Sequence, residues 1–284
     1  MISIRRARPD DLDFLVDLLN HEDVQPFLGG RAPRDRDGLA AELERSASDP
    51  TGYGHFVIEV DGRPAGVMGF EIENRRSRIA QLERLAVHPD FRGARVSDEA
   101  ARLLQRHLAV ELGFHRLQLE IYGFNERAQR HAERAGFVRE GVRRKAYWRH
   151  GEWMDGVLYA LTREDLDVPD ALGLLHDYVM VHNECVRTGD WEPLAEWFAD
   201  DAELVFEGVS VGPFSGREEI AAAYRERPPD DHVVIFGAEE VAGRVVARYG
   251  WLREPGKQAG RMLVTPRDSK IQKLVVTFEE AGEV

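Results

Sequence analysis

The stretch Leu82–Ser97, with the sequence LERLAVHPDFRGARVS, decides the fold of the first half of the chain. We expect a strand to end at Val87, a turn to continue past Gly93, and a helix to run from Ser97 to about Leu112. A turn that leads into a helix presents unpaired N–H groups and the positive end of the helix dipole. Such a site suits an anion as large as a pyrophosphate.

Strands and helices alternate on both sides of this stretch, through the first 165 residues. Apolar residues at three- and four-residue spacing predict the helices, and apolar runs bounded by turn residues predict the strands. The expected elements are a strand at 2–6, helices at 9–20 and 36–47, strands at 55–60, 65–72 and 78–87, a helix at 97–112, a strand at 117–121, a helix at 125–135, and strands at 137–142 and 156–161. This mixture indicates an α/β domain.

A second domain begins after an acidic segment that contains Pro169 and has no apolar periodicity. Beyond it, helices are followed by strands, which is typical of an α+β domain with a curled antiparallel sheet. The expected elements are helices at 174–185, 191–198 and 218–225 and strands at 204–209, 233–238, 244–253, 261–266 and 270–279. The sequence therefore predicts two domains, 1–165 and 171–284, joined by a linker at 166–170.

Charge and composition restrict the function classes. The chain has 284 residues and a net charge of -13, and residues 166–284 contribute 12 basic against 23 acidic residues, a net of -11. An acidic half of this kind has no electrostatic reason to bind nucleic acid. No apolar stretch approaches the ~20 residues of a membrane helix. The single cysteine, Cys185, and the absence of a His-Glu-x-x-His arrangement predict neither a disulfide framework nor a metal site. We expect a cytoplasmic protein.

Three further segments support the reading of the first domain: NERAQRHAERAGF at 125–137, REG at 139–141 and GEWMD at 151–155. With the opening stretch they resemble the GNAT superfamily of N-acetyltransferases, nearest to its RimJ/RimL-like branch, over about residues 1–165. The resemblance implies a mixed, mostly antiparallel central sheet. It also implies an acyl-CoA-dependent N-acyltransferase that moves an acetyl or other acyl group to a primary amine of a small molecule, peptide or protein. The implied contacts of acetyl-CoA, or another acyl-CoA, are Leu85, Ala86, Val87, Arg92, Gly93, Ala94, Arg95, Val96, Ser97 and Asn125.

Two residues depart from the pattern of that family. Arg95 stands where the turn has a glycine that lets the backbone approach the phosphates, although its guanidinium could bind a phosphate from the side. Ala132 stands where many members have a tyrosine that protonates the departing thiolate, so a water or Tyr147 would have to substitute. Ser97 is a good helix N-cap, whereas Asp98 places negative charge beside the expected anion.

The catalytic candidates each have a structural alternative. Glu83 matches a position at which many relatives hold a general base, but it could equally be a solvated or ion-paired strand glutamate. Asn125 suits either the cap of its helix or a hydrogen bond to the pantetheine arm of the cofactor. Tyr147 and Trp148 suit either an acceptor pocket or packing. Backbone amides near Leu85 would polarise the thioester carbonyl.

The second domain resembles the SnoaL-like, ketosteroid-isomerase-like group of the nuclear-transport-factor-2-like superfamily. The segments with this resemblance are TGDWEPLAEWFADDAEL at 188–204, GREEI at 216–220 and the strand at 271–278. The resemblance implies a cone of helices on a curved antiparallel sheet, with a pocket at one end, and pairing of sheet faces into a homodimer. A one-residue shift of register would point the candidate base, Glu207, outward. The candidate pocket residues are His182, Glu207, Tyr224, Tyr249, Trp251 and Arg253.

Three function classes therefore remain open. The first is the acyltransferase. The second is an enzyme with isomerase-, cyclase- or hydrolase-type chemistry in the cone, with a degenerate transferase domain as its scaffold. A buried acid/base pair in the cone would support this class. The third is a non-catalytic ligand-binding or dimerisation protein. This class stays open because Arg95 and Ala132 depart from the family pattern.

Overall fold

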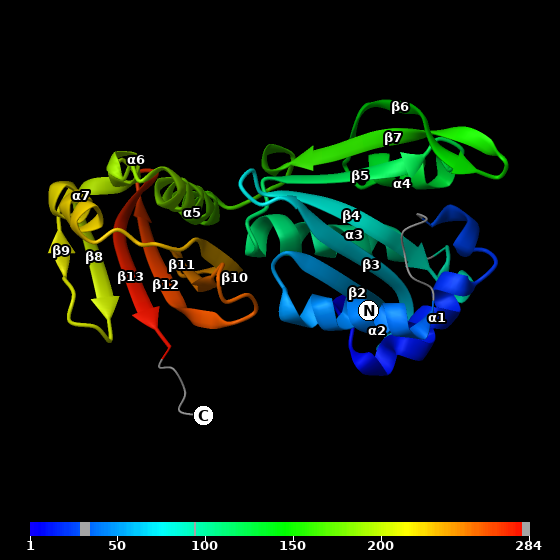
Figure 1. The fold of residues 1–284 in the computed structure, drawn as a ribbon, viewed down its shortest axis with the longest axis horizontal. Helices are drawn as coiled ribbons and strands as arrows, with labels where there is room; N and C mark the ends of the chain where they lie inside the picture. Colours follow the sequence, from blue (N-terminus) through cyan, green and yellow to red (C-terminus); the bar gives the residue numbers. More distant parts are fainter. Residues whose placement is uncertain (29–34, 94, 280–284) are drawn as a thin grey trace. The chain divides into compact units, whose positions relative to one another are not determined.

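The computed structural model describes residues 1–28, 35–93 and 95–279 (Figure 1). The chain divides into two compact units. The first comprises residues 1–109 and 114–167, and the second comprises residues 110–113 and 168–284. The sequence did not predict that the four residues 110–113 would group with the second unit.

The first unit is built on a seven-stranded sheet with the order β1-β2-β3-β4-β5-β7-β6. Its neighbouring strands are antiparallel except β4 and β5, which are parallel. This is the mixed, mostly antiparallel sheet that the family resemblance implied. The strands are β1 (Ile2–Arg6), β2 (Tyr53–Val60), β3 (Arg63–Asn74), β4 (Ile79–Val87), β5 (Arg116–Tyr122), β6 (Val138–Arg149) and β7 (Glu152–Thr162).

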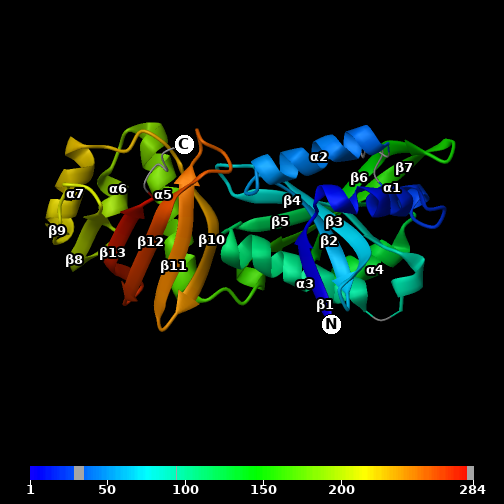
Figure 2. The same cartoon turned by 90° about the horizontal axis from the view of Figure 1, so that it is seen from below.

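Helices cover both faces of this sheet (Figure 2). On one face, the buried leucines of α1 and α2 form a core with Val57, Val67 and Ala86. On the other face, Phe56 and Phe70 contact residues of the α3 region and the chain that follows it. The helices are α1 (Leu12–Asn20), α2 (Arg36–Ser48), α3 (Val96–Arg106), its π-helical continuation His107–Glu111, and α4 (Glu126–Arg134).

Strands β4 and β5 separate after three paired positions, and this separation positions the site. They pair only from Ile79 with Arg116 to Gln81 with Gln118. Further along β4 the register against β3 shifts, and Arg84 adopts a positive φ of 61°. One extra residue in a strand, with a residue in the left-handed region, is a β-bulge, which bends the strand and increases its twist. The parallel strands therefore open into a split within the sheet.

The second unit contains a six-stranded sheet with the order β10-β11-β12-β13-β8-β9. Its strands are antiparallel apart from the parallel pair β13 and β8. The expected helix at 191–198 is shorter, because β8 already begins at Phe198. The strands are β8 (Phe198–Glu207), β9 (Phe214–Ser215), β10 (Val233–Val241), β11 (Arg244–Trp251), β12 (Gln258–Arg267) and β13 (Lys270–Phe278), and the helices are α5 (Asp170–Thr188), α6 (Glu192–Ala195) and α7 (Arg217–Glu226).

The interior of the second unit is packed with aromatic side chains. Trp191 stacks on Tyr224 with the ring centroids 5.3 Å apart, and the Tyr178 and Tyr224 hydroxyls are 2.8 Å apart. His182 lies edge-on to Trp191 at 5.4 Å and is 3% exposed. These rings pack among many buried aliphatic side chains, and burial of both kinds stabilises the core.

Candidate functional site

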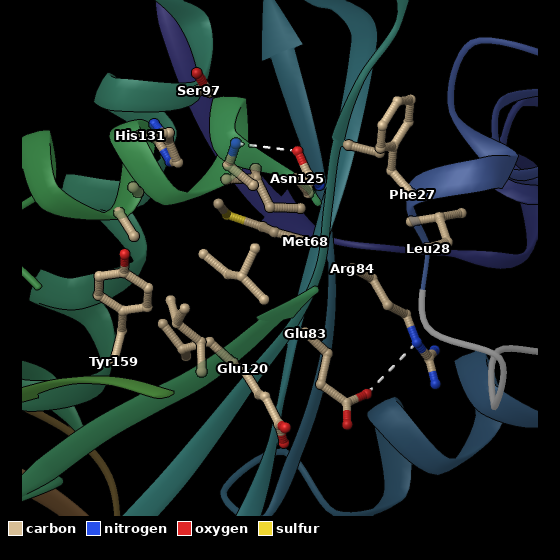
Figure 3. Close-up of a pocket in the computed structure, with 18 of the residues that line it drawn as sticks. Phe27, Leu28, Met68, Glu83, Arg84, Ser97, Glu120, Asn125, His131 and Tyr159 are labelled. Atoms are coloured by element: carbon tan, nitrogen blue, oxygen red, sulfur yellow. Dashed lines mark hydrogen bonds and ion pairs between the residues drawn. The ribbon is translucent and has the colours of Figure 1, made fainter. Parts of the chain in front are cut away.

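A cavity of about 1230 Å³ follows the split between β4 and β5 (Figure 3). It is lined by residues from both faces of the sheet, for example Glu120 on one face and its neighbour Leu119 on the other. Successive residues of a strand point to opposite faces. A single cavity that touches both must therefore pass through the sheet, and the split is where it does so.

The face of the cavity toward α2 is polar and acidic. We call it the carboxylate face and define it by Glu83 on β4 and by Gln118, Glu120 and Tyr147 on β5 and β6. Gln118 donates to Gln81 over 3.3 Å at the closed end of the split. Beyond Gln81 and Gln118 the two strands no longer pair, and the carboxylate face is open there. Glu83 lies on the β4 side of this opening and Glu120 on the β5 side.

Glu83 is held by ionic contacts on this face. Its side chain is 36% exposed, and its Oε2 lies 3.5 Å from Arg84 Nε. Arg84 is itself bound by both oxygens of Glu42 on α2, one of them at 2.8 Å, and its Nη1 donates to the Tyr53 hydroxyl over 3.2 Å. The bulge explains this arrangement, because it turns two consecutive residues of β4 toward the same side of the sheet.

The opposite face of the cavity lies against α4, and we call it the α4 face. Ala132, predicted to replace a tyrosine, is 2% exposed and lines the cavity. Asn125 caps α4 by accepting a hydrogen bond from the Ala128 amide over 3.1 Å, so its structural role is present. Tyr159 lies on this face too, and its hydroxyl donates to Glu133 over 3.2 Å.

Tyr147 lies at one end of the carboxylate face, and the next residue of β6, Trp148, points to the opposite side of the sheet. Tyr147 packs edge-on against Tyr122 at 5.1 Å, and burial, with a contribution from the neighbouring Glu120 carboxylate, raises its pKa to about 12. Trp148 is 59% exposed and packs against Trp153 at 5.5 Å. Because Tyr147 shares a face with Glu120 and not with α4, it does not occupy the place of the tyrosine that Ala132 replaces.

The turn between β4 and α3 contributes the predicted cofactor residues. Leu85, Ala86, Val87, Arg92, Gly93, Arg95, Val96 and Ser97 all line the cavity, whereas Ala94 lies outside the described residues. Arg92 Nη2 donates to the Asp23 carbonyl over 3.1 Å, and its Nη1 lies 3.5 Å from the Asp23 carboxylate. Arg92 thereby ties the turn to the segment before α2.

The helix start differs from the sequence prediction. Helix α3 begins at Val96, and Arg95 occupies the N-cap position with φ 54° and ψ 26°, in the left-handed region. Ser97 is therefore the second residue of the helix and does not cap it. The left-handed conformation is the reason a glycine suits this position, and arginine holds it at a cost of about 1 kcal/mol.

The sequence suggested that Asp98 would repel a bound anion, but neighbouring side chains compensate its negative charge in the structure. Its Oδ1 lies 2.8 Å from His131 Nδ1 and 3.4 Å from Arg134 Nη2. Although burial opposes the shift, these two partners hold the pKa of Asp98 below its usual value. The arginines that line this end of the cavity are Arg92, Arg95, Arg127 and Arg134.

Sequence reasoning missed three residues of the site: Glu120, His131 and Tyr159. Glu120 gave a weak signal, because a glutamate between Leu119 and Ile121 follows the polar–apolar alternation of a strand with one polar face. His131 and Tyr159 gave none, since only the packing of α4 on the sheet brings them to the cavity.

The predicted pocket residues of the second unit do not form one group. His182, Tyr224 and Tyr249 are buried in the core. Trp251 is half-buried and lies edge-on to Tyr249 at 5.5 Å. Arg253 is exposed and pairs with Asp230 at 2.9 Å.

Glu207 is exposed and pairs in register with Thr277, while its neighbour Phe206 packs against the core. It therefore lies on the outer face of the sheet, where the one-residue alternation places it. Among the described residues there is no cluster of three side chains able to hold a metal ion, and no helix there is long and apolar enough to cross a membrane.

Comparisons with known proteins agree with both units. Residues 2–138 match the family model of the acetyltransferase (GNAT) domain, and residues 172–242 match that of the SnoaL-like domain. The SPbeta prophage-derived uncharacterized N-acetyltransferase YokL of Bacillus subtilis (strain 168) is 23% identical over 168 residues, which cover 59% of this chain and 93% of that protein.

Solved structures share the fold of the first unit. The spermidine N-acetyltransferase of Vibrio cholerae in complex with CoA and spermine has a TM-score of 0.52 at 19% identity, covering 58% of this chain and 96% of that one. The ribosomal L7/L12 alpha-N-protein acetyltransferase in complex with coenzyme A has a TM-score of 0.51 at 17% identity, covering 57% and 93%. Residues 2–138 are therefore similar to acetyltransferase (GNAT) domains, and residues 172–242 are similar to SnoaL-like domains.

Proposed function

We propose that the first unit transfers an acyl group, in the first instance acetyl, from an acyl-CoA to a primary amine of a small molecule or peptide. The observation that supports this most directly is the cavity through the split sheet. It joins a turn with several arginines to a face with two carboxylates. A long anionic thioester and a cationic amine need these two environments at opposite ends of one passage.

The residues of the cavity fit an acyl-CoA. Arg92, Arg95, Arg127 and Arg134 line the end at the turn and suit phosphate groups. Beyond Gln81, β4 no longer pairs with β5 in the described chain, so its backbone can bind an extended arm. When bound, the cofactor would supply an activated acyl group and a thiolate leaving group.

The protein's own contributions lie at the split. Glu83 takes the proton from the ammonium of the acceptor, because only the neutral amine is a nucleophile. Arg84, fixed by Glu42, orients the Glu83 carboxylate. Backbone amides near Leu85 and Val87, beside the bulge, polarise the carbonyl that is attacked. Ala132 donates no proton to the leaving thiolate.

Calorimetry with acetyl-CoA and with CoA tests the proposal, followed by an assay for CoA release in the presence of primary amines. Arg92→Ala should weaken binding of both nucleotides, because it removes a charged phosphate contact. Absence of binding at millimolar ligand would contradict the proposed function.

We further propose that the second unit pairs with a second copy of the chain through its outer sheet face. Alternating residues of β11, β12, β13 and β8 that point away from the core cluster form an apolar row across this face: the half-buried Val246, Leu263 and Val205, and Val275, which is 9% exposed. The next row is charged at both ends, with Arg248 and Arg261 at one and Glu207 at the other.

The apolar and charged rows of one copy can match the same rows of a second copy. A twofold axis parallel to the strands, between β12 and β13, places β11 of one copy on β8 of its partner. It would bring Arg248 opposite Glu207 and Val246 opposite Val205. An axis across the strands would instead bring together like charges, such as Arg248 and Arg244. The first arrangement is an isologous contact of the kind that closes a homodimer.

A further inference from the structure

Glu120, which the proposed mechanism does not use, occupies a position equivalent to that of Glu83. Both residues lie two positions beyond the last paired residues of the parallel strands, Gln81 and Gln118. Residues equally far along parallel paired strands lie on the same face of the sheet. Figure 3 shows both carboxylates turned to the same side, away from the residues of the α4 face. The two carboxylates therefore flank the mouth of the split.

The Glu120 carboxylate is held in place, but its hydrogen-bonding capacity is not fully used. Its Oε2 accepts a hydrogen bond from Arg143 Nη1 over 2.8 Å. Its Oε1 is buried beside Tyr147, whose hydroxyl interacts with the Glu120 carboxylate, but no donor among the described residues meets Oε1 with full hydrogen-bond geometry. A buried carboxylate oxygen without a full set of donors is costly, so an ammonium that displaces the Tyr147 ring and donates to Oε1 gains binding energy.

Close packing also reserves the space around Glu120. Gly156 lies on β7 opposite Tyr122, diagonal to Glu120, and a Cβ at that position would collide with Glu120 Oε1 and crowd the Tyr147 ring. The chain therefore keeps the carboxylate in this position by having no side chain at Gly156.

The other charges around the carboxylate face are largely paired with one another. Arg84 binds both oxygens of Glu42. Arg116 binds both oxygens of Glu140, one of them at 2.8 Å. Arg45 pairs with Glu71. These arginines are thus engaged by partners other than Glu120.

We propose that Glu120 binds the acceptor's ammonium group together with Glu83, so that the nitrogen is held between two carboxylates at the mouth of the split. This rests on the proposed function and specifies its substrate class. The acceptor is a primary amine that enters as a cation and has no acidic group beside its nitrogen. An amine that has a carboxylate close by would meet two like charges there.

Steady-state acetyl transfer by the full chain tests this, with acetyl-CoA as donor and three acceptors: butylamine, Nα-acetyl-lysine amide and β-alanine. The wild-type protein should use the first two and discriminate against β-alanine. Glu120→Gln should raise the KM for butylamine about 10- to 100-fold, the range for a lost hydrogen bond to a charged group. The kcat and the KM for acetyl-CoA should change little.

Two variants serve as controls. Glu152→Gln removes the same charge from an exposed site on β7 outside the cavity and should leave all constants unchanged. Glu120→Asp keeps the charge and should recover part of the lost affinity for butylamine. An unchanged acetyl-CoA KM in Glu120→Gln shows that the variant is folded.

The outcomes separate the two proposals. Acetyl transfer in which Glu120→Gln leaves the butylamine KM unchanged, or in which β-alanine is used as well as butylamine, overturns the role of Glu120 and leaves the proposed function standing. Absence of transfer to every acceptor overturns the proposed function, and the role of Glu120 with it.

Discussion

At the scale of single residues, Arg95 combines two opposing effects. Its backbone is in the left-handed region at φ 54°, which disfavours any side chain, while its guanidinium lines the cavity at the end proposed for phosphates. Arg95→Gly removes both the strain and the charge, and Arg95→Ala removes only the charge. If the Cβ at this position limits how closely the backbone approaches the phosphates, Arg95→Gly should bind CoA several-fold more tightly than Arg95→Ala, whereas relief of the left-handed strain, about 1 kcal/mol, should appear in the stability of Arg95→Gly. Calorimetry measures the difference, and equal affinities would show that the Cβ at this position does not matter.

Glu83 is the residue on which the proposed chemistry depends most. Glu83→Gln keeps the shape of the side chain and its place beside Arg84 but cannot accept a proton. Loss of a general base typically lowers the rate ~10²–10⁴-fold. We expect kcat for amine acetylation to fall in this range while the affinity for acetyl-CoA is unchanged. A fall of less than threefold would assign the proton transfer to another group.

The buried histidines make the folded protein sensitive to acid. Burial lowers the pKa of His182 to about 4, from 6.5 in an unfolded chain, and that of His55 to about 3. Below pH 6.5 the unfolded state binds more protons at these sites, so stability falls as the pH drops from 6.5 toward 4. For His182 alone the loss approaches about 3 kcal/mol at pH 4.

His182→Phe tests this assignment, because phenylalanine keeps an aromatic ring and cannot be protonated. Urea unfolding of the variant should lose stability less steeply than the wild type between pH 6.5 and 4. An identical pH dependence in the two proteins would contradict the assignment.

The site residues that could be predicted from the sequence lie in contiguous segments, whereas those that could not are brought to the site by tertiary packing. Arg92, Gly93 and the departures at Arg95 and Ala132 lie in contiguous segments, where the resemblance to a family identifies them, and each lines the cavity. Glu120 reaches the site only through the register of β5 beside β4. Register between distant strands is set by tertiary packing, which a single sequence does not specify.

At the scale of elements, the bulge in β4 is the feature that sequence patterns missed. Most strand and helix positions were predicted, but nothing in LERLAV marks Arg84 as left-handed. A bulge normally favours glycine at such a position. Here the contact of Arg84 with Glu42 and Tyr53 offsets the strain, and these partners lie about 30 to 40 residues away in the chain.

That contact leads to a prediction about stability. Glu42→Gln leaves the Arg84 guanidinium half-paired at a site where its side chain is 12% exposed. Breaking one half of a largely buried ion pair costs about 3 kcal/mol or more, whereas removing both charges costs less. Urea unfolding should therefore show the double variant Glu42→Gln with Arg84→Gln to be more stable than Glu42→Gln alone. A double variant whose loss equals the sum of the single losses would show that the two residues are not coupled.

At the scale of the whole molecule, the two-unit organisation and the contrast in charge between its halves followed from the sequence. The role of the second unit did not. Its expected pocket residues are divided between a packed aromatic core and the surface, as His182 and Glu207 illustrate. Whether inward positions of a curved sheet leave a pocket depends on side-chain packing, which hydrophobic alternation does not reveal.

The proposed homodimer depends on charge pairing across the outer sheet face of the second unit. In the proposed homodimer, Arg248 of each copy lies opposite Glu207 of the other. Arg248→Glu places two acidic side chains together at each of the two symmetric contacts, and like charges across an interface cost several kcal/mol. Sedimentation of this variant should therefore show monomer at concentrations where the wild type is a dimer, and Glu207→Arg should do the same. Combining Arg248→Glu with Glu207→Arg restores opposite charges and should restore the dimer. A wild-type protein that sediments as a monomer, or a double variant that stays monomeric while its folded content matches the wild type, would overturn this pairing of the sheet faces.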